Sequence, residues 1–324
     1  MKTHEQNNTE SPTTTWKLLA LIFFFVSVSL AVWGWPAITG RLSNVGFSNP
    51  YPLIDPARSF TPQEHFIVNL QPLREELREL VQKEGPGSVS LYFEFLNTGA
   101  NINIGQEVRI WPASLSKLPL AMAVMKKVED GAWQLDTELV LKEEEKDAEF
   151  GALFQNPAGT TFTVERLLQE LLTNSDNTAY HIFLENMNPP ELDSIIIETG
   201  LEELFDKKGW FSAKEYSRLW RALYTSSFLK RGNSTRILKW LSETDFDEYL
   251  ASGIDKNILF AHKWGRNQNY RVFLDSGIVY IPNRPYIITV MIRGDGSAGE
   301  EGRATMILQN IGSTVYNYII SYTN

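Results

Sequence analysis

The hydrophobic pattern separates one long apolar segment near the N-terminus from the rest of the chain. Residues 18–38 (LLALIFFFVSVSLAVWGWPAI) carry no charge, and tryptophans stand close to both ends of the run. At about 1.5 Å per residue such a run is long enough to cross a bilayer core as a helix, and indole rings favour the membrane interface. We therefore predict a short polar tail over 1–17, a transmembrane anchor over 18–38 and a linker over 39–61.

A cleaved signal peptide is the alternative interpretation of the same segment. Ser29, Leu30 and Ala31 offer small residues around a cleavage point, as signal peptides do. The apolar run continues past that point and exceeds a usual signal core, which favours the uncleaved anchor. Charges flanking the segment differ little, so they do not fix its orientation.

Residue 62 begins a region in which helical and strand periods alternate in a fixed order. Apolar residues recur at three- and four-residue steps up to about residue 80, and Gly85-Pro86-Gly87 ends that helix. Two β-like runs follow, over 88–96 and 102–110, around the hairpin signal Asn97-Thr98-Gly99. Helical patterns then dominate from 114 to about 250, three further β-like runs occupy 258–292, and a last helix is expected over 300–322.

This order predicts one domain over 62–324 with an α/β fold of the α+β type. Its expected architecture is a five-stranded antiparallel sheet flanked by the terminal helices, with an inserted all-helical lobe. The chain has 324 residues, of which 43% are hydrophobic and 21% charged, and this composition suits such a domain.

Charge and residue usage exclude several classes of function. The formal net charge of -9 and the pI near 5.1 argue against nucleic acid as a partner. The chain has no cysteine, and its four histidines show no metal-ligand spacing, so we predict neither a metal nor a cofactor. No G-x-S-x-G motif is present either, although a Ser-His-Asp triad needs no fixed spacing and stays open.

Ser114 is the strongest candidate nucleophile. It opens the motif Ser114-Leu115-Ser116-Lys117 at the start of an apolar helix, where free backbone N–H groups and the helix dipole lie nearby. Lys117 is three residues further on, so its amine projects from the same helix face. If burial and a second cation lower the pKa of Lys117, its neutral amine can accept the serine proton. A second S-x-x-K sequence, Ser227 to Lys230, is interpreted as a solvated helix end.

Two further motifs supply partners for this serine. Ser175-Asp176-Asn177 stands between two helical stretches, where Ser175 can relay a proton and Asn177 can hold a substrate amide. The same residues also suit an N-cap at the next helix. Lys263-Trp264-Gly265 precedes a β-hairpin, where the lysine can add a cation and the backbone N–H after Gly265 can join that of Ser114 in an oxyanion hole.

The three motifs together resemble the S-x-x-K, S-D-N and K-T-G set of class A β-lactamases and penicillin-binding proteins. The resemblance implies an acylated serine at Ser114, a base at Lys117, a relay at Ser175, an amide holder at Asn177 and an electrostatic anchor at Lys263. It also implies acyl-serine chemistry on β-lactams or on D-alanyl-D-alanine ends of peptidoglycan, and an extracytoplasmic location.

The chain departs from the family pattern at two points. Trp264 replaces the usual threonine or serine that binds the substrate carboxylate, and Arg266 is the candidate that takes over this contact. No glutamate in the family's context follows Asn177 to activate the deacylating water. The nearby candidates Glu198, Glu202 and Glu203 are interpreted as surface carboxylates, and the acidic run 143–149 as a solvated segment.

We therefore predict a monomeric serine hydrolase, anchored by a single membrane pass, with its catalytic domain outside the cytoplasm. Deacylation is predicted to be slow, and the substrate is either a small β-lactam or a cell-wall peptide. The alternative is a surface receptor that binds penicillin or peptidoglycan without turnover.

Overall fold

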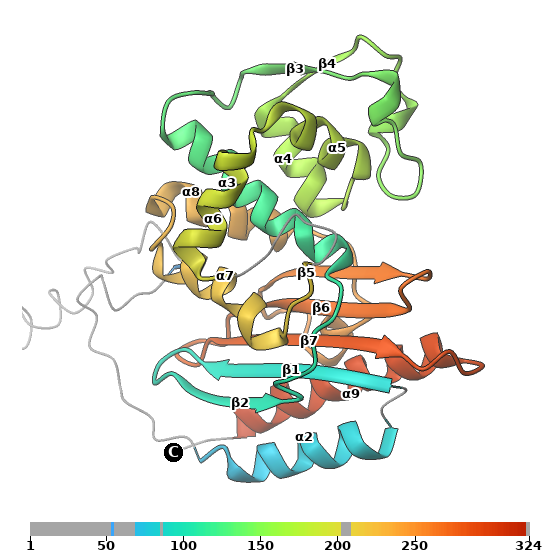
Figure 1. Ribbon diagram of the computed structural model, residues 1–324. Coiled ribbons are helices and arrows are strands. Elements are labelled where there is room, and N and C mark those ends of the chain that lie inside the picture. The colour runs from blue at the N-terminus through green and yellow to red at the C-terminus, as the bar shows by residue number, and fades with distance from the viewer. Residues whose placement is uncertain (1–52, 55–68, 85–86, 202–208, 322–324) are drawn as a thin grey trace, which may run out of the picture. The chain divides into compact units, whose positions relative to one another are not determined.

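An antiparallel five-stranded sheet forms the centre of the domain in the computed structural model, which describes residues 53–54, 69–84, 87–201 and 209–321 (Figure 1). The strand order is β2-β1-β7-β6-β5, so the first strand pairs with the last. β6 is buried at every position because both faces of the sheet are covered. The strands are β1 (Gly87–Phe95), β2 (Ala100–Ile104), β5 (Phe260–Asn267), β6 (Val272–Val279) and β7 (Tyr286–Gly294).

The two terminal helices pack together on one face of this sheet. They are α2 (Gln71–Glu84) and α9 (Glu300–Ser321), and Figure 1 shows both on the side opposite the helical lobe. Buried residues of α9 recur at three- and four-residue steps from Ala304 to Ile319, which is the period that buries one stripe of a helix. The predicted architecture of a sheet with terminal helices is therefore confirmed.

The inserted lobe contains α3 (Lys117–Glu129), α4 (Val164–Thr173), α5 (Asn177–Asn186), α6 (Pro189–Thr199), α7 (Ala213–Thr225) and α8 (Arg231–Leu241). Helix α7 covers the second face of the sheet, against β1, β6 and β7. The first nine residues of α3 are all buried, which makes it the central helix of the lobe. The lobe also carries a short hairpin of β3 (Glu138–Val140) and β4 (Thr161–Thr163), which the helical periodicity did not indicate.

The second strand ends earlier than the sequence pattern predicts. It ends at Ile104, because Gly105 turns the chain away with a φ of +64° and lies against the sheet. A Cβ at this glycine would lie 2.0 Å from the Val89 carbonyl oxygen, so only glycine fits. Ile110, the expected end of the strand, instead forms an isolated bridge with Phe211.

The predicted tail 1–17 and anchor 18–38 lie outside the described residues, as does most of the linker 39–61. Within the described part of the chain, no helix has both the length and the apolar character needed to cross a membrane. Leu53 and Ile54 are described and belong to the hydrophobic core, and the Leu53 carbonyl accepts a hydrogen bond from the Tyr280 hydroxyl at 2.7 Å. The packed part of the chain thus includes two residues of the predicted linker.

Candidate active site

Ser114 lies on a short 3₁₀ turn, η2 (Ala113–Ser116), that leads directly into α3. Ala113 has a left-handed φ of 45°, a conformation that is uncommon for residues other than glycine and that occurs often at functional sites. The turn is held by the Ser116 hydroxyl, which donates to the Ala113 carbonyl at 2.8 Å, and by the Tyr216 hydroxyl, which donates to the Leu115 carbonyl at 2.8 Å. Ser114 is thereby fixed at the N-terminal end of the central helix.

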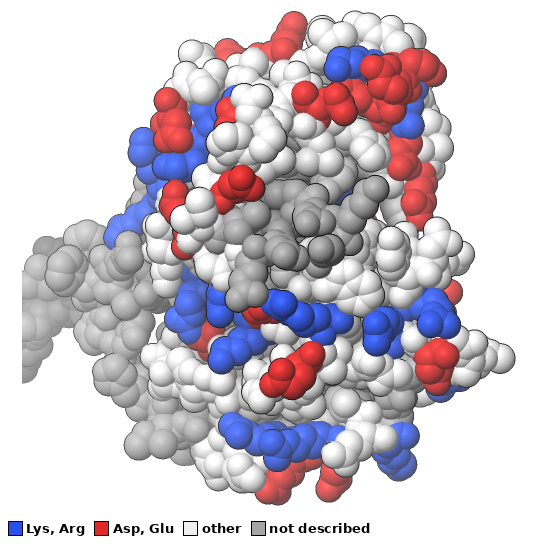
Figure 2. Space-filling view, viewed as in Figure 1, with Lys and Arg blue, Asp and Glu red and all other residues white. Residues whose placement is uncertain are grey.

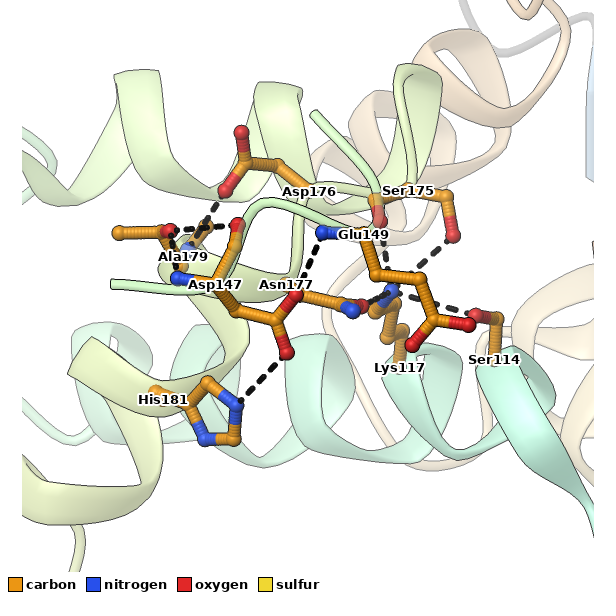
Figure 3. A network of polar contacts seen from close by, with 10 residues as sticks. Ser114, Lys117, Asp147, Glu149, Ser175, Asp176, Asn177, Ala179 and His181 are labelled. Atoms are coloured by element: carbon orange, nitrogen blue, oxygen red, sulfur yellow. Dashed lines mark hydrogen bonds and ion pairs between the residues drawn. The ribbon is translucent and has the colours of Figure 1, made fainter. Parts of the chain in front are cut away.

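The Lys117 amine is the meeting point of the first two sequence motifs. Its Nζ lies 3.2 Å from the Ser114 Oγ and 3.1 Å from the Ser175 Oγ. The same atom lies 2.6 Å from the Ser175 carbonyl oxygen and 2.5 Å from the Asn177 Oδ1. Figure 3 shows these side chains converging from α3 and from the start of α5. The structure therefore brings together four of the residues that the motifs single out.

Burial sets the proton affinity of this amine. Lys117 is 2% exposed, and burial lowers its pKa to about 7, although the carboxylates of Asp176, Asp147 and Glu149 partly oppose the shift. Near neutral pH the amine is therefore about half neutral. A neutral amine donates two N–H bonds and keeps one lone pair, so it can donate to the Ser175 carbonyl and to Asn177 while it accepts the proton of Ser114. This arrangement provides a general base without histidine.

Strand β5 supplies the third motif from the edge of the sheet. Gly265 lies against the nucleophile turn, since a Cβ at this position would be 3.1 Å from the Ser114 backbone nitrogen. Lys263 is fully buried, and burial together with the nearby Lys117 charge holds its pKa well below the usual range. Lys263 thus lies near Lys117, and Gly265 lies against the Ser114 backbone nitrogen.

Trp264 packs against aromatic side chains beside the cleft. Its ring stacks on Phe246 with 4.0 Å between centroids, and it meets the edge of Phe150 at 5.5 Å. Trp264 does not line the cleft above Ser114, whereas Phe150 does. The tryptophan supports the cleft wall from behind, and the prediction that it contacts substrate has no geometric support here. Arg266 does line the cleft, and its Nη1 donates to Glu301 at 2.8 Å.

The Asp176 carboxylate connects the start of α5, which carries Asn177, to the loop 147–153. Its Oδ1 accepts from the Ala179 backbone N–H at 2.8 Å, which is the N-cap that the sequence indicates. Its Oδ2 accepts from the backbone N–H groups of Ala152 and Leu153 at 2.8 and 3.0 Å. Gly151 makes this approach possible, because a Cβ there would lie 2.0 Å from the Asp176 Oδ2. One buried carboxylate therefore holds both the start of α5 and the loop 147–153.

The interpretation of 143–149 as a solvated acidic run is wrong for part of that run. Glu145 is 1% exposed and accepts from the Lys142 N–H at 2.7 Å, and Asp147 and Glu149 line the cleft together with Ser114. The loop that Asp176 tethers carries both carboxylates on the cleft wall, and Figure 3 shows Glu149 extending toward Ser114 while Asp147 points toward His181. Glu143 and Glu144 are exposed, as predicted.

The remaining candidates lie away from the nucleophile or outside the described residues. Glu198 is exposed on α6 and does not line the cleft, and residues 202 and 203 are not described. His262 is buried on β5 and its Nδ1 lies 2.8 Å from the Asp275 Oδ1, a structural pair. His181, by contrast, lines the cleft, and its Nε2 lies 3.6 Å from the Asp147 Oδ2. Among the described residues no His, Asp and Glu group could hold a metal ion.

Comparison with known proteins agrees with this geometry. A sequence model of the beta-lactamase enzyme family matches residues 72–319. The beta-lactamase VEB-1 of Pseudomonas aeruginosa is 21% identical over 250 residues, which cover 69% of this chain and 83% of that protein.

Solved structures share the fold over nearly their whole length. PBP-A superposes with a TM-score of 0.72 at 23% identity, covering 80% of this chain and 99% of that one. A beta-lactamase from Sphaerobacter thermophilus superposes with a TM-score of 0.70 at 18% identity, covering 79% and 98%. A variant of PBP-A, at 24% identity and a TM-score of 0.71 with 81% and 100% covered, was solved as an acyl-enzyme complex with penicillin G.

The tether formed by Asp176 predicts a specific loss of stability. Asn replaces Asp as an N-cap at little cost, so Asp176→Asn retains the cap of α5 but loses the charged acceptor for Ala152 and Leu153. We expect the free energy of unfolding to fall by about 3 kcal/mol, measured by urea denaturation. Asp193→Asn, at an exposed position of α6, is the matched control and should change it by less than about 0.5 kcal/mol. Equal effects of the two substitutions would contradict the tether.

Proposed function

Since the chain belongs to the beta-lactamase enzyme family, we propose that Ser114 is acylated by β-lactams or by the D-alanyl-D-alanine type of cell-wall amide. The observation that carries this proposal is the position of the Lys117 Nζ, within 3.2 Å of the Ser114 Oγ and 3.1 Å of the Ser175 Oγ. The buried amine connects the nucleophile to a second hydroxyl, which is the path a proton needs from the attacking serine to the leaving nitrogen.

The acylation step follows from these contacts. The Ser114 Oγ attacks the carbonyl carbon while its proton passes to the neutral Lys117 amine. In this proposal the backbone N–H of Ser114 and the N–H that follows Gly265 receive the developing oxyanion. Lys263 adds positive charge only in its protonated form, because burial and the Lys117 charge hold its pKa well below the usual range. Ser175 then donates its proton to the leaving nitrogen and regains one from Lys117, so the C–N bond breaks and the acyl group stays on Ser114. Arg266, on the wall of the cleft, is the proposed partner of the substrate carboxylate.

Deacylation is proposed to be slow. The carboxylates that line the cleft among the described residues are Asp147 and Glu149, from the loop before α5, and Glu198 of α6 lies outside the cleft. The described residues after Asn177 therefore place no carboxylate in the cleft that could act as a base for the incoming water. The same observation favours the second candidate function, a surface receptor that is acylated once and does not turn over.

Membrane attachment is a further part of the proposal and rests on the uncharged run 18–38. In the proposed arrangement the run spans the membrane and the domain faces the extracytoplasmic side. We expect the full chain to stay with membranes after a carbonate wash, while a variant that lacks 18–38 is released. Release of both proteins by the wash would exclude the anchor.

Covalent labelling tests the nucleophile. Intact mass spectrometry of the full chain with penicillin G should show one adduct on Ser114 that persists for hours, because no described carboxylate after Asn177 reaches the cleft to activate the deacylating water. Ser114→Ala should abolish the adduct. Ser227→Ala, which alters the second S-x-x-K sequence between α7 and α8, should leave it intact. Labelling of Ser114→Ala at the wild-type level would exclude Ser114 as the nucleophile. Multiple turnover with any ester or D-alanyl-D-alanine peptide would exclude the function of a receptor without turnover.

The rate of acylation should depend on pH through Lys117. The reactive form is the neutral amine, so the rate should rise with pH and level off above an inflection at about 7. The measurement is the second-order rate constant of penicillin acylation between about pH 5 and 9. A profile that is flat across this range, with Ser114 still labelled, would exclude Lys117 as the base.

A further inference from the structure

A second hollow adjoins the catalytic cleft at the free end of β5. It shares Glu149, Phe150, Arg266 and Asn267 with the cleft, and it adds Gln268 and Asn269 from the β5–β6 turn. We call this hollow the side pocket. Its volume of about 290 Å³ is at the small end for ligand sites, so it suits a compact polar group rather than a whole ligand.

The side pocket presents both signs of charge. Glu149 supplies a carboxylate, Arg266 supplies a guanidinium that is paired with Glu301, and residues 267–269 supply side-chain amides. Figure 2 shows the same contrast on a larger scale, with acidic side chains gathered on the lobe above the ends of β5 and β6 and basic side chains at those ends. A ligand that matches this lining carries a positive and a negative group close together.

Glu149 is the charged residue of this lining whose carboxylate has no bonded partner among the described residues. Within the described part of the chain its carboxylate makes no hydrogen bond and no ion pair, and Figure 3 shows it extending toward Lys117 and Ser114. Asp147, two residues earlier, is engaged instead. It accepts from the Glu149 backbone N–H at 2.8 Å and lies beside Asn177 and His181, contacts that hold its pKa below the usual range. The ligand's cation therefore has one open carboxylate to pair with.

We propose that the side pocket binds an α-amino acid group, an ammonium and a carboxylate on one carbon, at the end of the substrate's acyl side chain. Glu149 receives the ammonium, and the side-chain amides of residues 267–269 receive the carboxylate. An ammonium alone would leave the side-chain amide N–H groups without an acceptor, and a carboxylate alone would meet Glu149 as a like charge. This inference deepens the proposed function and rests on acylation at Ser114.

The test compares three cephalosporins that share one nucleus and differ only at the end of the acyl chain. The α-aminoadipoyl compound carries the zwitterion, the adipoyl compound lacks the ammonium and the δ-aminovaleryl compound lacks the carboxylate. We expect the zwitterion to acylate Ser114 of the full chain about fivefold faster than either partner compound, the range of an exposed ion pair. Stopped-flow kinetics and intact mass give the second-order rate constants.

Glu149→Gln should reduce the ratio of α-aminoadipoyl to adipoyl rates to about one. The ratio is the decisive quantity, because any effect of Glu149 on the basicity of Lys117 acts on both compounds equally and cancels. Glu144→Gln, an exposed acid of the same run that lines neither hollow, is the matched control and should keep the ratio. Raised salt should also lower the ratio in the wild-type protein.

Two results would overturn the inference while leaving the proposed function intact. One is acylation of wild-type protein at the same rate by all three compounds. The other is a zwitterion preference that survives in Glu149→Gln. Failure of penicillin G and of every cephalosporin to label Ser114 would instead remove the proposed function, and the inference with it.

Discussion

The site depends on one buried amine. Lys117 loses its water when α3 packs into the lobe, and burial disfavours its charged form more strongly than the nearby carboxylates restore it. Four oxygen atoms replace the lost water and fix the direction of the Nζ. The neutral amine and its orientation therefore have the same cause, which is the close packing around α3. A looser lobe would return the lysine to solvent, and the serine would lose its base.

The same constraint explains why the sheet and the lobe must share a core. Leu115 and Leu118 belong to the hydrophobic cluster that also includes Ile278 and Met291 of the sheet, so α3 and the strands are packed as one body. Only this packing lets the edge strand β5 approach within contact of the Ser114 backbone, at Gly265. The backbone at Gly265 is thus brought to Ser114 by tertiary packing, while the serine and lysine are aligned by one turn of helix.

The sequence predicted the fold class and most elements because these depend on local patterns. The periodicity of apolar residues predicted the strands of the sheet and the helix α9. The three-residue spacing predicted that Lys117 lies beside Ser114. What failed depended on contacts between distant residues. Nothing local marks Asp147 and Glu149 as cleft residues, since their direction comes from the hydrogen bonds of Asp176, and Trp264 turns toward Phe246 because of packing. Gly151 is the local sign of a constrained loop in this segment, because its backbone conformation and its contact with Asp176 leave no room for a side chain.

Asp176 also shows how chemistry and selectivity can be separated within one cleft. One of its oxygens holds the start of α5, where Ser175 and Asn177 meet the amine, and the other holds the loop that carries Glu149. The proton path is therefore built from buried groups that tolerate little change, whereas the Glu149 side chain is exposed and attached to the same anchor by backbone contacts alone. Because backbone N–H groups make the attachment, the Glu149 side chain can vary without moving the relay. The fold thus allows substrate preference to change at positions that leave the acylation machinery in place.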